Sequence, residues 1–250
     1  MENSETGFPK TKKDMLKHWL LNLAVRHPIW LGLLFPSVEG EALNVKPVPG
    51  CGPEDYARGL VELIESGMVR LSSQVPGDEV ESLVGVSQIL DRFLKLAKDD
   101  SILRRDDRLL KPYQRNRLPG MKVSFRLTAL GGETWEKVAE PDWMHIVTES
   151  GDAASGDIIS PDRDRLMATI AWYPELNQEQ VQLETIKWQT HSDFEVLYWK
   201  RLPFVYHVSF ARQVAQVRWA NAETEWFRDW RFSLSSWYKE PWELPDWPSD

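Results

Sequence analysis

The stretch FRLTALGGETWEKVAEPDW, Phe125–Trp143, decides how the first half of the chain folds. Its first four residues are typical of a β-strand. Gly131 and Gly132 follow, and two adjacent glycines give the backbone the freedom that a tight turn needs. A closing helix is predicted over 132–139, with Leu127 and Trp135 buried. The stretch therefore predicts a strand, a turn and a helix that together complete one structural unit.

Residues 53–72, PEDYARGLVELIESGMVRLS, predict a helix that runs directly into a second strand. Pro53 suits the first helical turn, and the two acids after it favour the positive end of the helix dipole. Gly67 is predicted to cap the helix, and the strand begins at Met68. The buried face is predicted to consist of Tyr56, Ala57, Leu60, Leu63 and Ile64.

Together, residues 53–72 and 123–140 resemble the last helix and the two wing strands of winged helix-turn-helix proteins. The turn LT-x-x-G after the returning strand belongs to the same likeness. The resemblance implies two earlier helices. One is predicted from Asp14, as N-cap, to the stop at His27-Pro28, and the other is a short apolar turn over 28–35.

The wing of this unit is predicted to be interrupted by an insertion over about 74–121. Within it, residues 80–98 have the periodicity of a helix with a broad apolar face that includes Val84. The predicted unit spans 13–143, and residues 1–12 are expected to be a disordered tail.

Residues 144–250 are predicted to form a second, tryptophan-rich half with mixed helix and strand. Strands are expected over 144–148, 181–190 and 204–210, the last with Phe204, Tyr206, Val208 and Phe210 on one face. Ser160 is the expected N-cap of a helix that buries Leu166, Met167 and Ile170 and stops before Pro174. Residues 198–207 are interpreted as a structural corner. The fold class is therefore α+β, with the halves either separate or one continuous domain.

Composition narrows the functional classes. The formal charge is −8, and a single cysteine, Cys51, excludes an internal disulfide and a zinc site built from several thiolates. The longest apolar stretch, Trp19–Phe35, is broken by polar residues, and the start of the chain lacks an apolar signal region. A cytoplasmic protein without membrane contact is expected.

No catalytic motif is present, so we expect no enzymatic activity, no cofactor and no metal. The five histidines are scattered singly, and no glycine-rich phosphate loop or G-x-S-x-G elbow occurs. Asp162 and Asp164 lie at a predicted helix start, where acids are typical of caps rather than of a carboxylate site. Cys51, in a Pro-Gly turn, is interpreted as a bystander rather than a nucleophile.

Nucleic acid is an alternative partner. In a winged helix the polar face of 53–65 would meet DNA, but it carries four acids and one base, which phosphates repel: Glu54, Asp55, Arg58, Glu62 and Glu65. A basic run over 101–126 has eight basic residues against two acids. It could bind a phosphate backbone in a salt-dependent way, or it could be a solvated segment. The candidate nucleic-acid contacts are Arg104, Arg105, Arg108, Lys111, Arg115 and Arg117.

The acidic and aromatic C-terminal tail is the other candidate contact, because tryptophan is enriched in interface hot spots. The chain has 13 tryptophans. The candidate partner-binding residues are Trp237, Trp242, Glu243, Asp246 and Trp247, in a region where prolines prevent regular structure. The tail either covers its own domain or binds a partner. In size, net acidity and lack of catalytic motifs the chain is similar to bacterial immunity and antitoxin proteins, which cover a toxin. We therefore expect a protein-binding module, with a DNA-binding regulator as the alternative.

Overall fold

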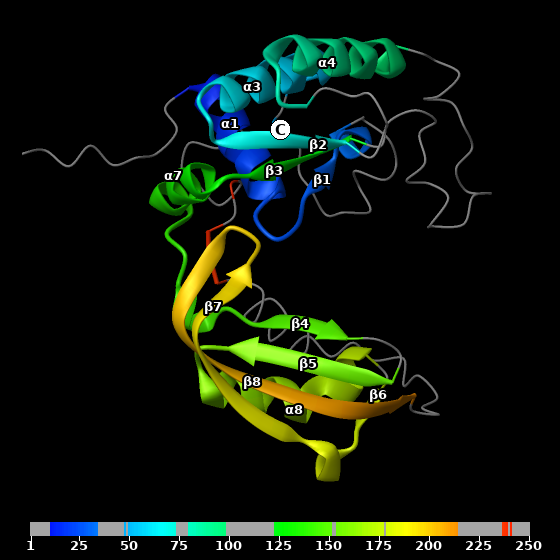
Figure 1. The fold of residues 1–250 in the computed structure, drawn as a ribbon, viewed down its shortest axis with the longest axis vertical. Helices are drawn as coiled ribbons and strands as arrows, with labels where there is room; N and C mark the ends of the chain where they lie inside the picture. The colour runs from blue at the N-terminus through cyan, green and yellow to red at the C-terminus, as the bar shows by residue number, and fades with distance from the viewer. Residues whose placement is uncertain are drawn as a thin grey trace, which may run out of the picture. The chain divides into compact units, whose positions relative to one another are not determined.

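The computed structural model describes residues 11–34, 48, 50–73, 80–98, 123–151, 154–177, 179–214, 237–239 and 241. The chain divides into two compact units: unit 1 is Met1–Ala139 with Glu240–Asp250, and unit 2 is Glu140–Lys239. Each unit contains helices and an antiparallel sheet (Figure 1), so the fold class is α+β. The division falls after Ala139, whereas the predicted boundary is at residue 143.

Unit 1 combines helices with a small antiparallel sheet of strand order β1-β3-β2. Its helices are α1 (Lys12–Leu23), α3 (Pro53–Glu65), α4 (Leu83–Ala97) and α7 (Ala129–Ala139), with the 3-10 turn η1 (Leu31–Leu34). Its strands are β1 (Ile29–Trp30), β2 (Val69–Ser73) and β3 (Val123–Leu127). All pairings are antiparallel, and Leu71 of β2 lies opposite Phe125 of β3. The predicted helix–strand pair over 53–72 is thereby confirmed.

The first helix differs from its prediction at both ends. Thr11, not Asp14, is the N-cap: its hydroxyl oxygen accepts the backbone N–H of Asp14 at 3.2 Å. Since Lys12 is already helical, the predicted disordered tail over 1–12 is wrong at that residue, and residues 1–10 lie outside the described residues. The helix ends at Leu23, before the predicted stop, because the backbone leaves the helical region at Ala24.

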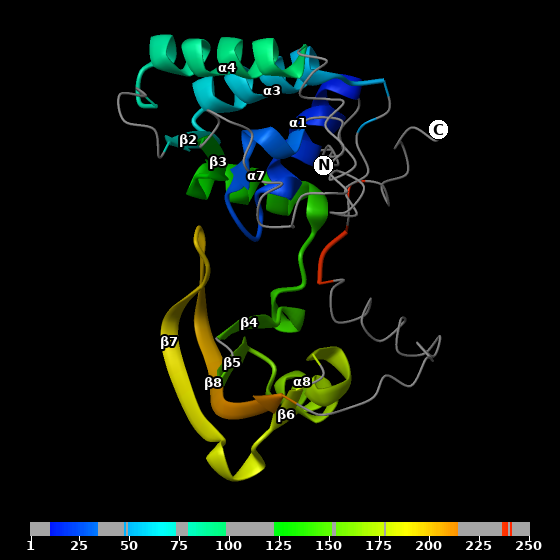
Figure 2. The same cartoon turned by 90° about the vertical axis from the view of Figure 1, so that its right-hand side faces the viewer.

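Helix α3 lies between α1 and α4 (Figures 1 and 2). Toward α1, Trp19 stacks on Tyr56 with ring centroids 5.4 Å apart. Gly59 permits the close approach, since a Cβ there would lie 2.9 Å from Leu20 Cδ1. Helix α4 buries Val86, Ile89, Leu90 and Phe93. Val84, predicted on that apolar face, is 69% exposed instead.

The two glycines of the opening stretch do not form a turn. Helix α7 begins at Ala129, so Gly131 and Gly132 are its first-turn residues. Thr128 caps it: its hydroxyl oxygen accepts the N–H of Gly131 at 3.1 Å. A Cβ on Gly131 would lie 2.0 Å from the carbonyl oxygen of Met68, so glycine is needed for close approach rather than for a turn. Leu127 and Trp135 are buried as predicted.

In the described part of unit 2, helix α8 packs against a strongly paired antiparallel sheet. The described elements of unit 2 are η3 (Trp143–His145), β4 (Thr148–Gly151), β5 (Ser155–Ser160), α8 (Arg163–Asn177), β6 (Glu179–Val181), η4 (Leu183–Thr185), β7 (Lys187–Leu197) and β8 (Lys200–Val214). The strand order is β4-β5-β8-β6, and β7 also pairs with β8. The strand predicted over 144–148 is wrong, because β4 begins only at Thr148.

Helix α8 packs on the sheet through one apolar cluster, which consists of Ile158, Leu166, Ile170, Val208 and Phe210. The N-cap is Asp162 rather than Ser160: its carboxylate accepts the N–H groups of Asp164 and Arg165 at 2.9 and 3.2 Å. The helix continues past Pro174, so the predicted stop is wrong. Met167 is exposed rather than buried, whereas Leu166 and Ile170 are buried as predicted.

Candidate protein-binding surface

The most extended surface of unit 2 belongs to the hairpin of β7 and β8. The two strands pair from Lys187 opposite Ser209 to Leu197 opposite Lys200, so the predicted corner over 198–207 is a hairpin turn followed by strand. Within the described residues β8 is paired on both sides, whereas β7 is paired only with β8. Strand β7 is therefore an edge strand of the described sheet.

Aromatic side chains on the α8 side of this hairpin reach the surface. Trp188 lies opposite Val208, and Thr190 lies opposite Tyr206, so these side chains share one face of the sheet. Phe204 is two residues from Tyr206 on that face, and the two rings meet edge to face at 5.0 Å. Trp188 is 39% exposed and Phe204 is 41% exposed. We call Arg163, Trp188, Thr190, Phe204 and Tyr206 the hairpin surface.

A shallow groove of about 390 Å³ crosses part of this surface. It is lined by Arg163, Trp188, Gln189, Thr190 and Tyr206. Arg163 is the first residue of α8, and its guanidinium carbon lies 5.1 Å from the centroid of the Trp188 ring. This distance is within the range of a cation–π contact. The groove thus joins an oriented cation to aromatic, hydroxyl and amide groups.

The opposite face of the sheet carries a chain of three polar side chains. His207 Nε2 lies 2.9 Å from Asp157 Oδ1, and His191 Nε2 lies 3.1 Å from His207 Nδ1. A carboxylate can only accept, so neutral His207 donates from Nε2 and its Nδ1 accepts the N–H of His191. The centroids of the two histidine rings are 5.3 Å apart, and the two facing nitrogens are at hydrogen-bonding distance. This geometry is that of a hydrogen bond.

Sequence reasoning missed this pairing because it treated the histidines singly. His191 and His207 meet only through the β7–β8 register, and that register was hidden by the mistaken corner. Within the described residues, no three histidine, cysteine, aspartate or glutamate side chains form a group that could hold a metal ion.

A second aromatic cluster lies near the hairpin turn. The ring of Trp143 lies 5.8 Å from that of Trp199 and 4.9 Å from that of Trp237, and Lys200 Nζ lies 4.7 Å from the Trp143 centroid. The backbone N–H of Asp142 donates to the carbonyl oxygen of Trp237 at 2.7 Å. Trp237 was predicted to contact a partner, but it is 2% exposed and so packs within its own chain.

The remaining predicted contacts fall outside the described residues. In the tail these are Trp242, Glu243, Asp246 and Trp247. In the basic run they are Arg104, Arg105, Arg108, Lys111, Arg115 and Arg117.

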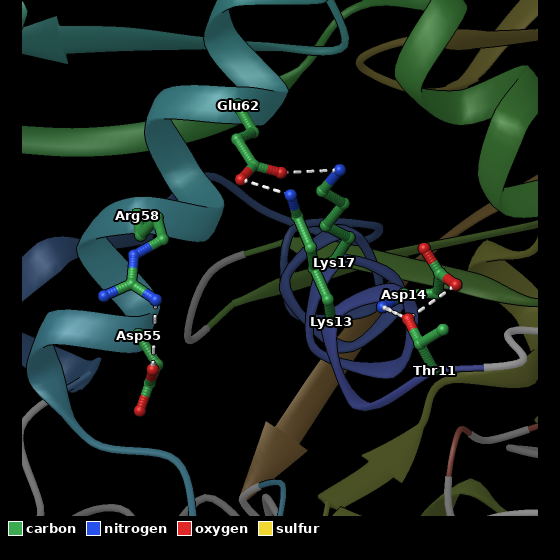
Figure 3. A network of polar contacts seen from close by, with 7 residues as sticks. All are labelled: Thr11, Lys13, Asp14, Lys17, Asp55, Arg58 and Glu62. Atoms are coloured by element: carbon green, nitrogen blue, oxygen red, sulfur yellow. Dashed lines mark hydrogen bonds and ion pairs between the residues drawn. The ribbon is translucent and has the colours of Figure 1, made fainter.

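The acidic face of α3 is paired with basic side chains of its own unit. Figure 3 shows Glu62 between Lys13 and Lys17 of α1, each ammonium 2.7 Å from a carboxylate oxygen. These lysines hold the pKa of Glu62 below its usual value. Glu54 lies 3.1 Å from Lys98 at the end of α4, which lowers its pKa in the same way. The acids predicted to meet DNA therefore include two that join α3 to its neighbouring helices.

Figure 3 also shows Arg58 beside Asp55, with 3.9 Å between their nearest charged atoms. Asp55 in addition accepts the backbone N–H of Gly52 at 3.0 Å, which completes the helix start. Cys51, in the preceding turn, has its thiol pKa raised by burial, the opposite of what an activated nucleophile needs.

Comparison with protein-family models, with curated proteins and with solved structures found no match for this chain. Among the helices of the described ranges, none has the length and apolar character needed to cross a membrane.

Proposed function

We propose that this protein is a non-enzymatic protein-binding module whose partner contacts the hairpin surface. The observation that carries the proposal is the exposure of Trp188 and Phe204 on one face of a long, well-paired hairpin. Large aromatic side chains that are half exposed on a rigid element are typical interface anchors, because they offer much contact area at a small entropic cost. Arg163 beside them adds a residue type that interfaces favour.

We further propose that unit 1 is a winged-helix-like scaffold with α4 inserted in its wing. The order of α1, β1, α3, β2 and β3, with β3 between the other two strands, supports this arrangement. In it, α3 takes the position of the helix that reads DNA. That helix packs against α1 and α4, and its acids pair with lysines of both neighbours. Unit 1 therefore offers a DNA duplex a poor reading surface.

The likeness to immunity and antitoxin proteins agrees with this proposal, since such proteins act by covering a partner. The hairpin surface is the place where covering would occur. The predicted tail contacts from Trp242 to Trp247 extend the same proposal beyond the described residues and are tested by truncating the chain after Pro241.

Co-purification tests the proposed function. The full chain, purified from its native source, is expected to bring down one protein in stoichiometric amount. The double variant Trp188→Ala with Phe204→Ala is expected to lose that protein, because its two aromatic anchors are gone. Val84→Ala is the control, since it shortens an exposed apolar side chain of unit 1. Retention of the partner by the double variant would refute the proposed surface.

A DNA-binding regulator is the second candidate, favoured by the eight basic residues within 101–126. It predicts duplex binding that weakens steeply with salt and is abolished by changing Arg104, Arg105 and Arg108 together to alanine. A polarisation titration over a salt series measures this. Tight binding of that kind would displace the protein-binding proposal, and its absence would remove the regulator.

A further inference from the structure

Arg163 lines the groove of the hairpin surface, and its N–H donors are not used by other described residues. Within the described part of the chain, the guanidinium of Arg163 makes no hydrogen bond or ion pair, and its contact is with the ring of Trp188. A guanidinium has five N–H donors and always carries its charge. Contact with an aromatic ring orients it without using those donors. Arg163 is therefore held in place with its donors available.

The acids next to Arg163 in sequence do not line the groove. Asp162 precedes it, but that carboxylate accepts two backbone N–H groups of α8 as the helix cap and is not among the lining residues. Asp164, which follows it, does not line the groove. The other lining residues are neutral: Trp188, Gln189, Thr190 and Tyr206. Although the whole chain carries a formal charge of −8, the charged side chain among the described lining residues is a cation, Arg163.

We propose that this groove binds the side-chain carboxylate of an acidic segment of the partner protein. The inference rests on the proposed function, which it makes more specific. A planar carboxylate can accept two parallel hydrogen bonds from one guanidinium. The hydroxyl groups of Thr190 and Tyr206 supply further donors in the same groove. A single cation among neutral groups matches one carboxylate better than a phosphate, which carries more charge at neutral pH.

The aromatic surroundings also specify what should flank the carboxylate. Trp188 and Phe204 are half exposed on either side of the Thr190–Tyr206 pair along the sheet face. A partner segment with apolar or aromatic residues next to its Asp or Glu would cover them as its carboxylate reaches Arg163. Partial removal of water from the ion pair would strengthen it.

Selection of short random peptides on the full-length protein tests the proposal. The peptides retained by the wild type are expected to share an Asp or Glu. Arg163→Gln should weaken their binding about tenfold or more, because a charge-assisted pair is lost. Replacing the peptide's acid by its amide should have a similar effect, and the two changes together should cost little more than either alone. Lys187→Gln is the matched control, since it removes a neighbouring exposed cation that does not line the groove.

The outcomes separate the two proposals. If the retained peptides bind wild type and Arg163→Gln equally but are lost in Phe204→Ala, the carboxylate groove is wrong and the protein-binding surface stands. If Lys187→Gln weakens binding as much as Arg163→Gln, the effect is general charge attraction and the groove is again wrong. If no retained peptide depends on Arg163, Trp188 or Phe204, both proposals are overturned.

Discussion

Replacement of His18 by leucine should remove a pH-dependent part of the stability of unit 1. His18 lies on the buried side of α1 and is 4% exposed. Within the described residues its Nε2 has no hydrogen-bond partner. Burial lowers its pKa from 6.5 to about 4. The folded protein thus holds His18 neutral at a pH where the unfolded chain would protonate it.

The magnitude follows from the two pKa values. Between pH 6.5 and about 4 the unfolded state binds a proton that the folded state does not, so stability falls as the pH falls through this range. A difference of one in pKa corresponds to about 1.4 kcal/mol, which gives a total loss of about 3 kcal/mol. Above pH 6.5 this contribution is fully present. At pH 4 and below it is gone.

Urea denaturation of the wild type and of His18→Leu, repeated from pH 7 to pH 4, measures the effect. The quantity of interest is the difference in unfolding free energy between the two proteins, because every other titrating group cancels. That difference should change by about 3 kcal/mol in favour of the variant as the pH falls. His27→Leu, which removes an exposed histidine, should show no such change. Parallel pH profiles for wild type and His18→Leu would refute the reasoning.

Four further changes test the structure of unit 1. Gly131→Ala should destabilise the protein by about 2 kcal/mol or more, because its methyl group would collide with a backbone carbonyl. Gly67→Ala, where only the positive φ is unfavourable, should cost about 1 kcal/mol, and the reverse order in thermal denaturation would contradict the structure. Trp135→Phe removes the buried hydrogen bond that the Trp135 indole N–H donates to Asn22 Oδ1 at 3.0 Å, and should cost about 1 to 2 kcal/mol in urea denaturation. Glu62→Gln breaks two exposed ion pairs, so its cost should stay below about 1 kcal/mol and shrink with added salt; a larger, salt-insensitive cost would count against surface pairing.

The elements that sequence predicted best are those with a clear period and clear ends. Residues 53–65 have apolar positions at helical spacing, a proline and acids at the start and a glycine just past the end, so α3 was predicted within a residue or two. The period of 80–98 likewise predicted α4. Exposure of Val84 was not predictable from period alone, because which apolar positions are covered depends on the neighbouring helix.

The errors arose where a residue's role depended on distant chain. The sequence predicts Gly131 as a turn residue. In the structure Gly131 instead allows helix α7 to pack closely against the backbone of Met68. The aromatic residues before Leu202-Pro203 suggested a corner. In the structure Pro203 lies across from Asp193, whose φ of 50° interrupts regular pairing, and Arg201 Nε donates to the Asp193 carboxylate at 2.9 Å. This local irregularity accommodates the proline within β8. Because a corner was predicted there, the hairpin, its register and the contact between His191 and His207 were not predicted.

The candidate site was missed for the same reason. Trp188, Phe204 and Arg163 carry no motif, and their proximity depends on a sheet register and on the point where α8 begins. The sequence favours the tail instead, because its tryptophans are dense in sequence. Trp237 shows that density alone does not distinguish a buried ring from an exposed one.

The bond between Asp142 and Trp237 has an evolutionary consequence. Both residues lie near the ends of unit 2, and Glu140 pairs with Lys239 one step further out. The two ends of unit 2 therefore lie close together. Unit 2 is an insertion within the sequence of unit 1, and we call such an inserted unit with adjacent ends a cassette. A cassette with adjoining ends can be exchanged or lost in one genetic event while the host keeps a short connection in its place. The sequence of unit 2 can thus change as one piece while unit 1 is preserved.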